Sequence, residues 1–393
     1  MSRFFSSKKN DVSQQEDTDK KNDVSRQDSL NEPAQRRDPD KPVQFDDALM
    51  RIGLGRGQTW SMIVMCLLWI GEGMQMFICF YLPKAFYDEW QTPVDDLAWV
   101  DGAMFVGVMV GALVGGHCGD AYGRRPTLLL FTAVSVITGL ICWITWSFVF
   151  LFSIRFLVGF GAGGFAPCAL ALSLEGCPSM YRGAIAIAVP GFSGAAGRLL
   201  TAIVAEALYD PDYNPNYSRM GWRGAMVLCC VPFLLALCLG FYTVSESARW
   251  LFCKGRREEA SDALANLALK NGTEHEFPRG TKLIPETDAE YEEASNPWVR
   301  IGREPLFSAL VLCSVSHLCL SVAYFGMIFA LPVYLESYGA ENGWTEQQKD
   351  IVLVIVAASE IPAIFLALYT IEISFIGTSS ISIHLHLHLH LYI

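Results

Sequence analysis

Eight apolar runs, each roughly 20 residues long, occupy most of the chain, and short charged turns separate them. A helix needs about 20 apolar residues to cross the roughly 30 Å hydrocarbon core of a bilayer. Backbone polar groups in lipid must be satisfied within the segment, and barrel strands would be shorter and alternating. The sequence therefore predicts an all-α membrane protein with about eight transmembrane helices. The runs are Gln58–Leu82, Leu97–His117, Pro126–Trp146, Phe148–Leu172, Gly183–Leu208, Trp222–Thr243, Leu306–Leu335 and Asp350–Tyr369.

The composition excludes several classes of protein. Only 18% of the residues are charged and the net charge is −11, so a basic surface for nucleic acid is not expected. The twelve cysteines form no CxxC pair, and most lie in apolar runs, where they behave as small hydrophobic residues. The loops contain no paired carboxylates, nucleophile elbow or metal-ligand spacing. We therefore expect neither an enzyme nor a metal or cofactor site.

The spacing of the runs predicts the domain organisation. Six helices come first, then about 60 polar residues, and then hydrophobicity resumes, which is the layout of transporters built from two repeated halves. We expect a disordered cytosolic tail and juxtamembrane helix, a complete six-helix N-terminal bundle, a cytosolic linker, the first two helices of a C-terminal bundle, and an aberrant tail. Their ranges are 1–57, 58–243, 244–305, 306–372 and 373–393.

Charge in the turns predicts the orientation. Basic residues gather in the turns at 119–125 and 181–182, so these turns and the N-terminus are expected in the cytosol. The sequon at Asn216 then falls in an outer loop and is a candidate for glycosylation, whereas the sequon at Asn271 falls in the cytosol and should be unused.

The turn at 115–125, GGHCGDAYGRR, resembles the signature loop of the major facilitator superfamily, G-x-x-x-D-R-x-G-R-R. It stands between the second and third predicted helices, as in that superfamily, although Ala121 replaces the usual basic residue. The resemblance implies an ionic latch in which Asp120 and Arg124 pair with neighbouring helix ends in one conformer and release in the other. The alternative is that Arg124 and Arg125 only set the topology.

Later motifs match the same superfamily in order. Residues 155–161 (RFLVGFG) resemble its fourth-helix motif R-x-L-x-G-x-G, and residues 246–256 resemble the P-E-S-P-R-W-L…G-R motif, with Ser245 and Ala248 in place of the prolines. One exposed ion pair contributes about 0–1 kcal/mol, but several in one network can bias a two-state element. The resemblance implies a cytosolic gating network of Asp120, Gly123, Arg124, Arg125, Arg155, Glu175, Arg182, Glu246 and Arg249.

Three other stretches resemble the synaptic-vesicle-protein and organic-ion branch of the sugar and organic-ion transporters. They are the lead-in at 45–58, the seventh-helix triplet Tyr324-Phe-Gly and the stretch Ser359-Glu-Ile-Pro. The match ends near Glu372 and gives way to a tail of alternating His and Leu. A metal-binding tract is one interpretation of that tail, and a retained intron or wrongly assigned exon is the preferred one. The chain would then be a C-terminally truncated transporter.

Two charges are predicted at membrane depth. Glu72 lies about 21 Å into the first helix and Arg198 about 24 Å into the fifth, at 1.5 Å per residue. Charges at this depth are costly and mark transport pathways. The hypothesis is that Glu72 carries a coupling proton or a cationic group and Arg198 meets an anionic group. The alternative is a static Glu72–Arg198 ion pair.

Neighbouring residues complete the predicted substrate site. Trp69 and Met76 share a helical face with Glu72, and Gln75 stands where the branch has its second acid. The resemblance to the organic-ion branch also implies that Tyr324 of the seventh helix belongs to this site. On the second helix, small residues recur every four positions, which predicts close helix packing, with or without sliding during transport. They are Ala103, Gly107, Gly111, Gly115 and Gly119.

The resemblance implies alternating-access transport of a small organic solute, most simply an organic ion, with proton coupling as a further expectation and a sugar as the alternative substrate. A different class of function is a truncated isoform that regulates or scaffolds a full-length partner. The expected partners are a solute, the lipid bilayer and protons, with no nucleic acid and no prediction of oligomeric state. The expected location is the plasma membrane or an intracellular vesicle.

Overall fold

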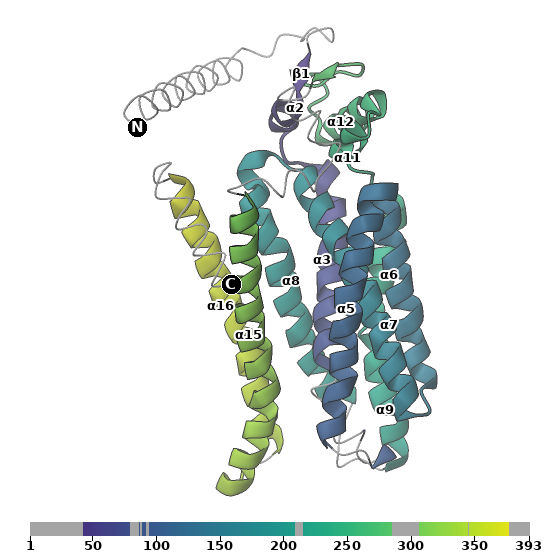
Figure 1. Ribbon diagram of the computed structural model, residues 1–393, viewed down its shortest axis with the longest axis vertical. Coiled ribbons are helices and arrows are strands. Elements are labelled where there is room, and N and C mark those ends of the chain that lie inside the picture. Colours follow the sequence, from purple (N-terminus) through teal and green to yellow (C-terminus); the bar gives the residue numbers. More distant parts are fainter. Residues whose placement is uncertain are drawn as a thin grey trace, which may run out of the picture.

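Long helices run side by side along one axis in the computed structural model (Figure 1). Seven helical segments of the described residues are long and apolar enough to cross a membrane. The prediction of an all-α, multi-pass membrane protein is therefore confirmed. The structure describes residues 42–78, 86, 89–91, 94–208, 215–284, 306–344 and 346–376.

The first six predicted runs coincide with a bundle of helices. Successive membrane spans run antiparallel, as short connections require (Figure 1). The helices are α3 (Arg56–Phe77), α5 (Val94–Tyr122), α6 (Arg124–Ile141) with the 3₁₀ turn η2 (Cys142–Ile144), α7 (Phe148–Glu175), α8 (Ser179–Leu208), α9 (Pro215–Leu228) and α10 (Val231–Thr243).

The sixth predicted run coincides with one candidate membrane span, Gly221–Thr243, but the helix is interrupted within it. Helix α9 ends at Leu228 and α10 begins at Val231, with two residues in a turn between them. Pro232 stands in the first turn of α10, where its missing N–H costs no hydrogen bond, and where it favours a new helix start. Helix α9 also contains Asn216, so the predicted outer loop is helical at this position.

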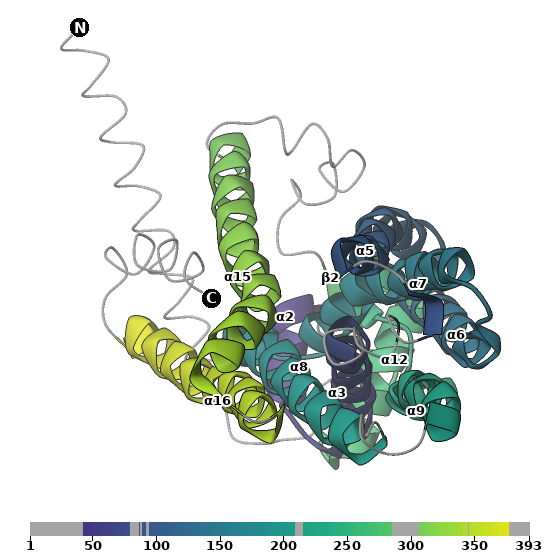
Figure 2. The ribbon, with the colours of Figure 1, turned by 90° about the horizontal axis from the view of Figure 1, so that it is seen from below.

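Two long helices, α15 (Leu306–Asn342) and α16 (Glu346–Ile376), stand beside the bundle and meet it along α8 (Figures 1 and 2). Helix α16 packs directly on α8, and α15 packs on α16. Residues 377–393, which include most of the predicted aberrant tail, lie outside the described part of the chain.

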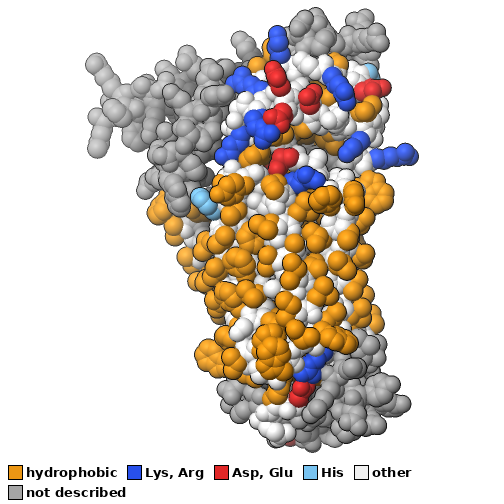
Figure 3. Space-filling view, turned by 90° about the vertical axis from the view of Figure 1, so that its right-hand side faces the viewer, with side chains coloured by type: hydrophobic (Ala, Val, Ile, Leu, Met, Phe, Trp, Pro, Cys, Tyr) orange, Lys and Arg blue, Asp and Glu red, His pale blue; other side chains and the backbone are white. Residues whose placement is uncertain are grey.

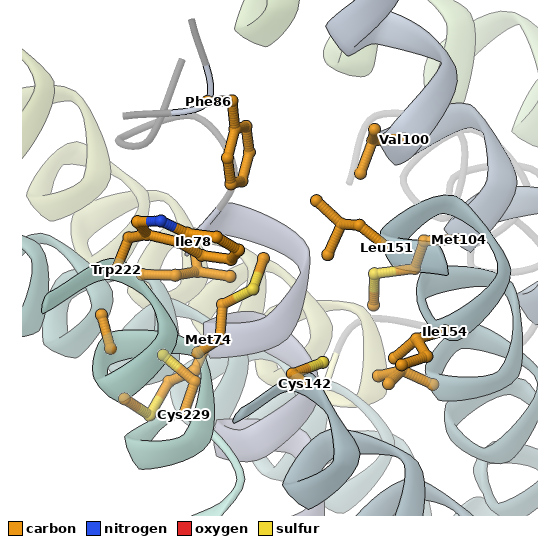
Figure 4. Packing of buried hydrophobic residues seen from close by; sticks show 13 residues of the cluster. Met74, Ile78, Phe86, Val100, Met104, Cys142, Leu151, Ile154, Trp222 and Cys229 are labelled. Atoms are coloured by element: carbon orange, nitrogen blue, oxygen red, sulfur yellow. The ribbon is translucent and has the colours of Figure 1, made fainter. Parts of the chain in front are cut away.

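Apolar side chains fill the bundle in two clusters. One lies towards the end away from the chain's N-terminal lead-in and contains Met74, Met104, Leu151 and Trp222 (Figure 4). The other joins α3, α6, α7 and α10 nearer the opposite end. Lipid tails are as apolar as these side chains, so within a bilayer the clusters stabilise the bundle through close van der Waals packing.

Helices α5 and α7 touch backbone to backbone. A Cβ atom added at Gly107, Gly111 or Gly115 would overlap a carbonyl oxygen of α7. Reciprocally, a Cβ atom at Gly159 or Gly163 would overlap a carbonyl of α5. The predicted close packing of the small-residue stripe is confirmed, and α7 is the helix that approaches it.

A small domain, here called the cap, covers one end of the bundle. Strand β1 (Val43–Gln44) pairs in parallel with β2 (Leu283–Ile284), although they are 240 residues apart. Helices α2 (Phe45–Ile52), α11 (Ala248–Cys253) and α12 (Arg257–Asn271) complete it. Its core includes Phe45, Leu49, Leu264 and Phe277. The lead-in and the linker, expected as separate stretches, therefore share one hydrophobic core.

The cap is fastened to the start of α3 through Asn271. The Asn271 Oδ1 atom accepts from the Gly57 N–H at 2.8 Å, and its Nδ2 donates to the Gly53 carbonyl at 3.2 Å. These bonds satisfy one of the donors that a helix start leaves open. Figure 3 shows charged side chains concentrated at the cap end and apolar side chains covering the face beyond it.

Candidate functional site

An ion pair at membrane depth connects the bundle to the α15–α16 pair. The Arg198 guanidinium of α8 pairs with the Glu360 carboxylate of α16. The Tyr324 hydroxyl of α15 donates to the other Glu360 oxygen at 2.7 Å. All three residues lie within apolar helical segments. Each charge is costly in hydrocarbon alone, so the pairing is what makes their position tolerable.

Glycine packing between α3 and α8 sets the position of Arg198. A Cβ atom at Gly197 would overlap the Ile70 carbonyl, and one at Gly73 would lie 2.6 Å from the Gly194 carbonyl. The two backbones are therefore in contact, and Arg198 lies over the Phe77 ring of α3 at 5.5 Å from its centroid. The guanidinium has an aromatic face on one helix and a carboxylate on another.

Glu72 is near this pair without being part of it. It interacts electrostatically with Arg198, but among the described residues it makes no salt bridge with it. The static Glu72–Arg198 ion pair is therefore replaced by Arg198–Glu360. Of the other predicted residues on this face, Trp69 is half-buried with its indole N–H unpartnered among described residues, and Met76 packs against the apolar cluster.

Gln75 lies in a different place from the one that its predicted role requires. It is buried inside the bundle, where its Nε2 atom donates to the Met226 carbonyl at 3.1 Å. The Arg155 guanidinium donates to the Gln75 side-chain and backbone oxygens at 3.1 and 2.8 Å, and to Asp101 Oδ1 at 3.3 Å. Gln75 thus joins α3 to α7 and α9, apart from Arg198.

Arg155 is likewise separate from the gating network predicted for it. It lies about 30 Å along α7 from Glu175, at 1.5 Å per residue, in the half of the bundle away from the cap. Its side chain is fully buried. The prediction that Arg155 joins the network at the helix ends is corrected by this position.

The cap end holds most of the predicted gating residues. Glu246 Oε1 accepts from the backbone N–H groups of Arg124 at 2.9 Å, Arg125 at 3.1 Å and Ser247 at 2.9 Å. A carboxylate at a helix N-terminus satisfies open donors and complements the helix dipole. Gly123 has φ +120°, and a Cβ atom there would overlap Glu246. Glycine at 123 is what lets this carboxylate reach α6.

Neighbouring side chains extend this cluster. Arg124 pairs with Asp120 at 2.7 Å and reaches Glu175 at 3.8 Å, while Arg125 donates to the Phe241 carbonyl at 2.8 Å. These contacts join α6 to α5, α7 and α10. The contacts given above for this cluster lie within the bundle and the segment that follows it, so they stabilise the bundle itself.

We expect Glu246→Gln to lower the stability of the protein by about 1–2 kcal/mol, because an amide oxygen replaces a charged acceptor of three N–H bonds. The check is the thermal unfolding of purified protein in detergent. Glu258→Gln, at an exposed carboxylate of α12, is the control and should leave the transition unchanged. Equal transitions for the two variants would contradict the capping role.

A second cluster depends on a residue that the sequence analysis did not select. Asp46 of α2 accepts two bonds from Arg182, at 2.8 and 3.3 Å, and one from Arg249 at 3.4 Å. Arg182 and Arg249 were predicted network members, but their shared carboxylate was missed. The sequence signal that could have identified Asp46 is its position as an acidic residue in the first turn of α2.

A pocket lies where the cap meets the bundle. Leu49, Met62 and Leu264 line its apolar side, and Glu175 and Glu246 also border it. Close by, burial raises the pKa of the Cys177 thiol to about 11, so this cysteine stays protonated and unreactive at neutral pH. No cluster of three or more potential metal ligands occurs within the described ranges.

Comparison with known proteins identifies the family. The family model described as "Sugar (and other) transporter" matches residues 53–373. The chain belongs to this family. The organic cation/carnitine transporter 7 of Arabidopsis thaliana is 28% identical over 311 residues, which cover 72% of this chain and 59% of that protein. The synaptic vesicle 2-related protein of Bos taurus is 29% identical over 245 residues, covering 62% and 42% respectively.

Solved structures agree on the fold. The structure of the proton:xylose symporter XylE bound to 6-bromo-6-deoxy-D-glucose superposes with a TM-score of 0.61 at 19% identity, covering 79% of this chain and 68% of that one. This sugar (and other) transporter family comprises membrane transporters and not enzymes. The chain spans 59% and 42% of the lengths of the two relatives described above.

Proposed function

We propose that this chain works as a secondary transporter that moves a small organic ion across a membrane by alternating access, with the cap on the cytosolic side. The observation that carries the proposal is the Arg198–Glu360 ion pair with Tyr324. It places opposite charges at membrane depth between two groups of helices, where a charged solute could exchange with either partner.

The contacts between the two helix groups are suited to switching. Besides the ion pair, aromatic contacts connect them, between Phe105 and Phe325 at 4.8 Å and between Phe192 and Phe365 at 4.9 Å. The bundle, by contrast, is held internally by glycine packing and buried polar bonds. A rigid bundle that meets a second group of helices mainly along one helix, α8, can rock against it as one body.

Proton coupling through Glu72 is the second part of the proposal. Glu72 makes no hydrogen bond or ion pair with a described residue, and an ionised carboxylate at this depth is costly even with Arg198 nearby. Binding a proton removes that cost, so protonation of Glu72 can be linked to the movement of the bundle. The relatives' names support an organic ion as the solute and a vesicle as the location.

The test is uptake by proteoliposomes that contain this chain, measured with labelled organic anions, organic cations and sugars at external pH 5.5 to 8. We expect organic-ion uptake to rise as the external pH falls, and Glu72→Gln to weaken this dependence on pH. Glu258→Gln serves as the control on the cap. An unchanged pH profile in Glu72→Gln would exclude the coupling role, and no uptake of any solute would exclude transport by this chain.

A further inference from the structure

We propose that Arg198 is the binding site for the carboxylate of a small aromatic monoanion, which displaces Glu360 as the partner of Arg198. Glu360 then takes up the proton that accompanies the anion. This inference rests on the proposed transport function and assigns it a substrate class. It also gives Glu360 a role: it takes up its proton directly as the anion binds, whereas protonation of Glu72 is proposed to be linked to the movement of the bundle.

The hydrogen-bonding capacity of Arg198 is only partly used. Its guanidinium has five N–H donors in a planar fork, and the described contact to Glu360 uses one of its terminal nitrogens. The Arg198 Nε atom is buried and has no described partner. A carboxylate can bond two nitrogens of an arginine side by side, so a bidentate ligand would satisfy more of these donors than Glu360 does.

The pair is accessible to such a ligand. The side chains of Arg198 and Glu360 are 18% and 20% exposed, in contrast to Arg155 and Asp101, whose values are 0% and 10%. The Arg155 pair is sealed within the bundle, whereas the Arg198 pair lies where the two helix groups meet. Of these two pairs, the Arg198 pair is therefore the one that an incoming solute could contact.

Charge balance favours an anion together with a proton. Arg198 and Glu360 sum to zero charge in the pair described. If an anion replaces Glu360 while Glu360 is protonated, the sum is again zero, and no uncompensated charge remains in the low-dielectric region. A cation bound to Glu360 would instead leave Arg198 unpaired, with Glu72 as its remaining nearby carboxylate.

The groups that face Glu360 can accommodate both of its protonation states. They are Arg198 from α8 and Tyr324 from α15, while Glu72 on α3 acts through Arg198. The Tyr324 hydroxyl donates to a carboxylate oxygen in the pair described, and it can donate equally to the carbonyl oxygen of a protonated Glu360. Tyr324 thus keeps Glu360 hydrogen-bonded after Arg198 releases it.

Aromatic side chains adjoin the pair and favour a ring on the rest of the ligand. Phe77 lies beneath the Arg198 guanidinium, and Tyr324 contacts the Phe325 ring with centroids 5.2 Å apart. Phe325 in turn meets Phe105 of the bundle. Aromatic rings pair edge-to-face or offset with added stabilisation, so a ring on the anion fits this lining better than an aliphatic chain.

The experiment compares three probes of nearly equal shape: benzoate, benzylammonium and benzamide. Their binding to the purified chain is measured by ligand-induced thermal shift and by isothermal titration at pH 6 to 8. We expect benzoate to bind best, with an affinity that rises about tenfold for each unit of falling pH where Glu360 is ionised. In weakly buffered solution, about one proton should be taken up for each benzoate bound.

Variants assign the effect to the two side chains. Glu360→Gln should bind benzoate with little pH dependence and at least tenfold more tightly at pH 8. Arg198→Gln should abolish benzoate binding. The double variant Arg198→Gln/Glu360→Gln removes both charges and serves as the folding control. Glu341→Gln, at an exposed carboxylate of α15, is the matched surface control and should behave as the wild type.

Several results would overturn the inference. They are stronger binding of benzylammonium than of benzoate, benzoate binding that survives in Arg198→Gln, and binding without proton uptake in the wild type. The last measurement needs no variant and therefore stands even if Glu360→Gln does not fold. Uptake of organic cations together with any of these results would leave the proposed transport function standing.

Discussion

Replacing Arg155 with methionine should cost the protein about 3–5 kcal/mol of stability, because a buried charge loses its partner. Arg155 is completely buried and connects Asp101 on α5 with Gln75 on α3. Without the guanidinium, the negative charge of the buried Asp101 carboxylate would lose the positive charge of Arg155 that balances it. Fluorescence-detected size-exclusion chromatography after heating should show a large loss of the monodisperse peak.

The double variant Arg155→Met/Asp101→Asn distinguishes this mechanism from loss of packing. If the stranded charge is the cause, removing the carboxylate as well should recover part of the stability, since neutral residues of similar size can replace a buried pair. Asp101→Asn alone should be destabilising for the converse reason. Equal heat resistance of Arg155→Met and the wild type would contradict the structural role, as would simple additivity of the two changes.

Gly115→Ala should be nearly as damaging, although it adds only one methyl group. The added Cβ atom would overlap the Gly164 carbonyl and Cα atoms of α7, so the two helices would have to move apart. Overpacking of this kind costs typically about 1–3 kcal/mol. We expect a clear fall in the midpoint of thermal unfolding and in the yield of folded protein.

Gly116→Ala is the matched control for this change. It lies one residue further along the same helix, and an added Cβ atom there meets nothing within 4 Å. Alanine favours helix over glycine by about 1 kcal/mol, so this variant should be neutral or slightly stabilising. If the two variants shift the unfolding midpoint equally, the backbone contact between α5 and α7 is not a source of stability.

The helices themselves could be predicted from the sequence because membrane insertion depends on local length and apolarity. The stripe from Gly107 to Gly115 could also be read as a close packing surface, since small residues at four-residue spacing lie on one helical face. The sequence could not say that α7 is the partner. Pro232 indicated a break in the helix before α10, and this signal was missed because the apolar run was treated as one segment.

The side-chain partners were the least predictable part of the site. Gln75 and Glu72 are one turn apart on α3, yet Gln75 is buried against Met226 while Glu72 lies near Arg198. Only the positions of neighbouring helices decide between these environments. Glu360 carried the same signal as Glu72, an acid in an apolar run, and was overlooked as a site residue because its partner is 162 residues away.

The pairing of β1 with β2 joins the segment that precedes the bundle in the sequence to the segment that follows it. Residues 42–284 contain the described contacts of the cap and of the bundle's core. A backbone cut between residues 284 and 306 would leave the β1–β2 pairing and the described core contacts of residues 42–284 within one piece. The protein should therefore be divisible there into two co-expressed pieces, the first folding on its own and the second docking onto α8. Such a split version would let each half be labelled separately for distance measurements during the transport cycle.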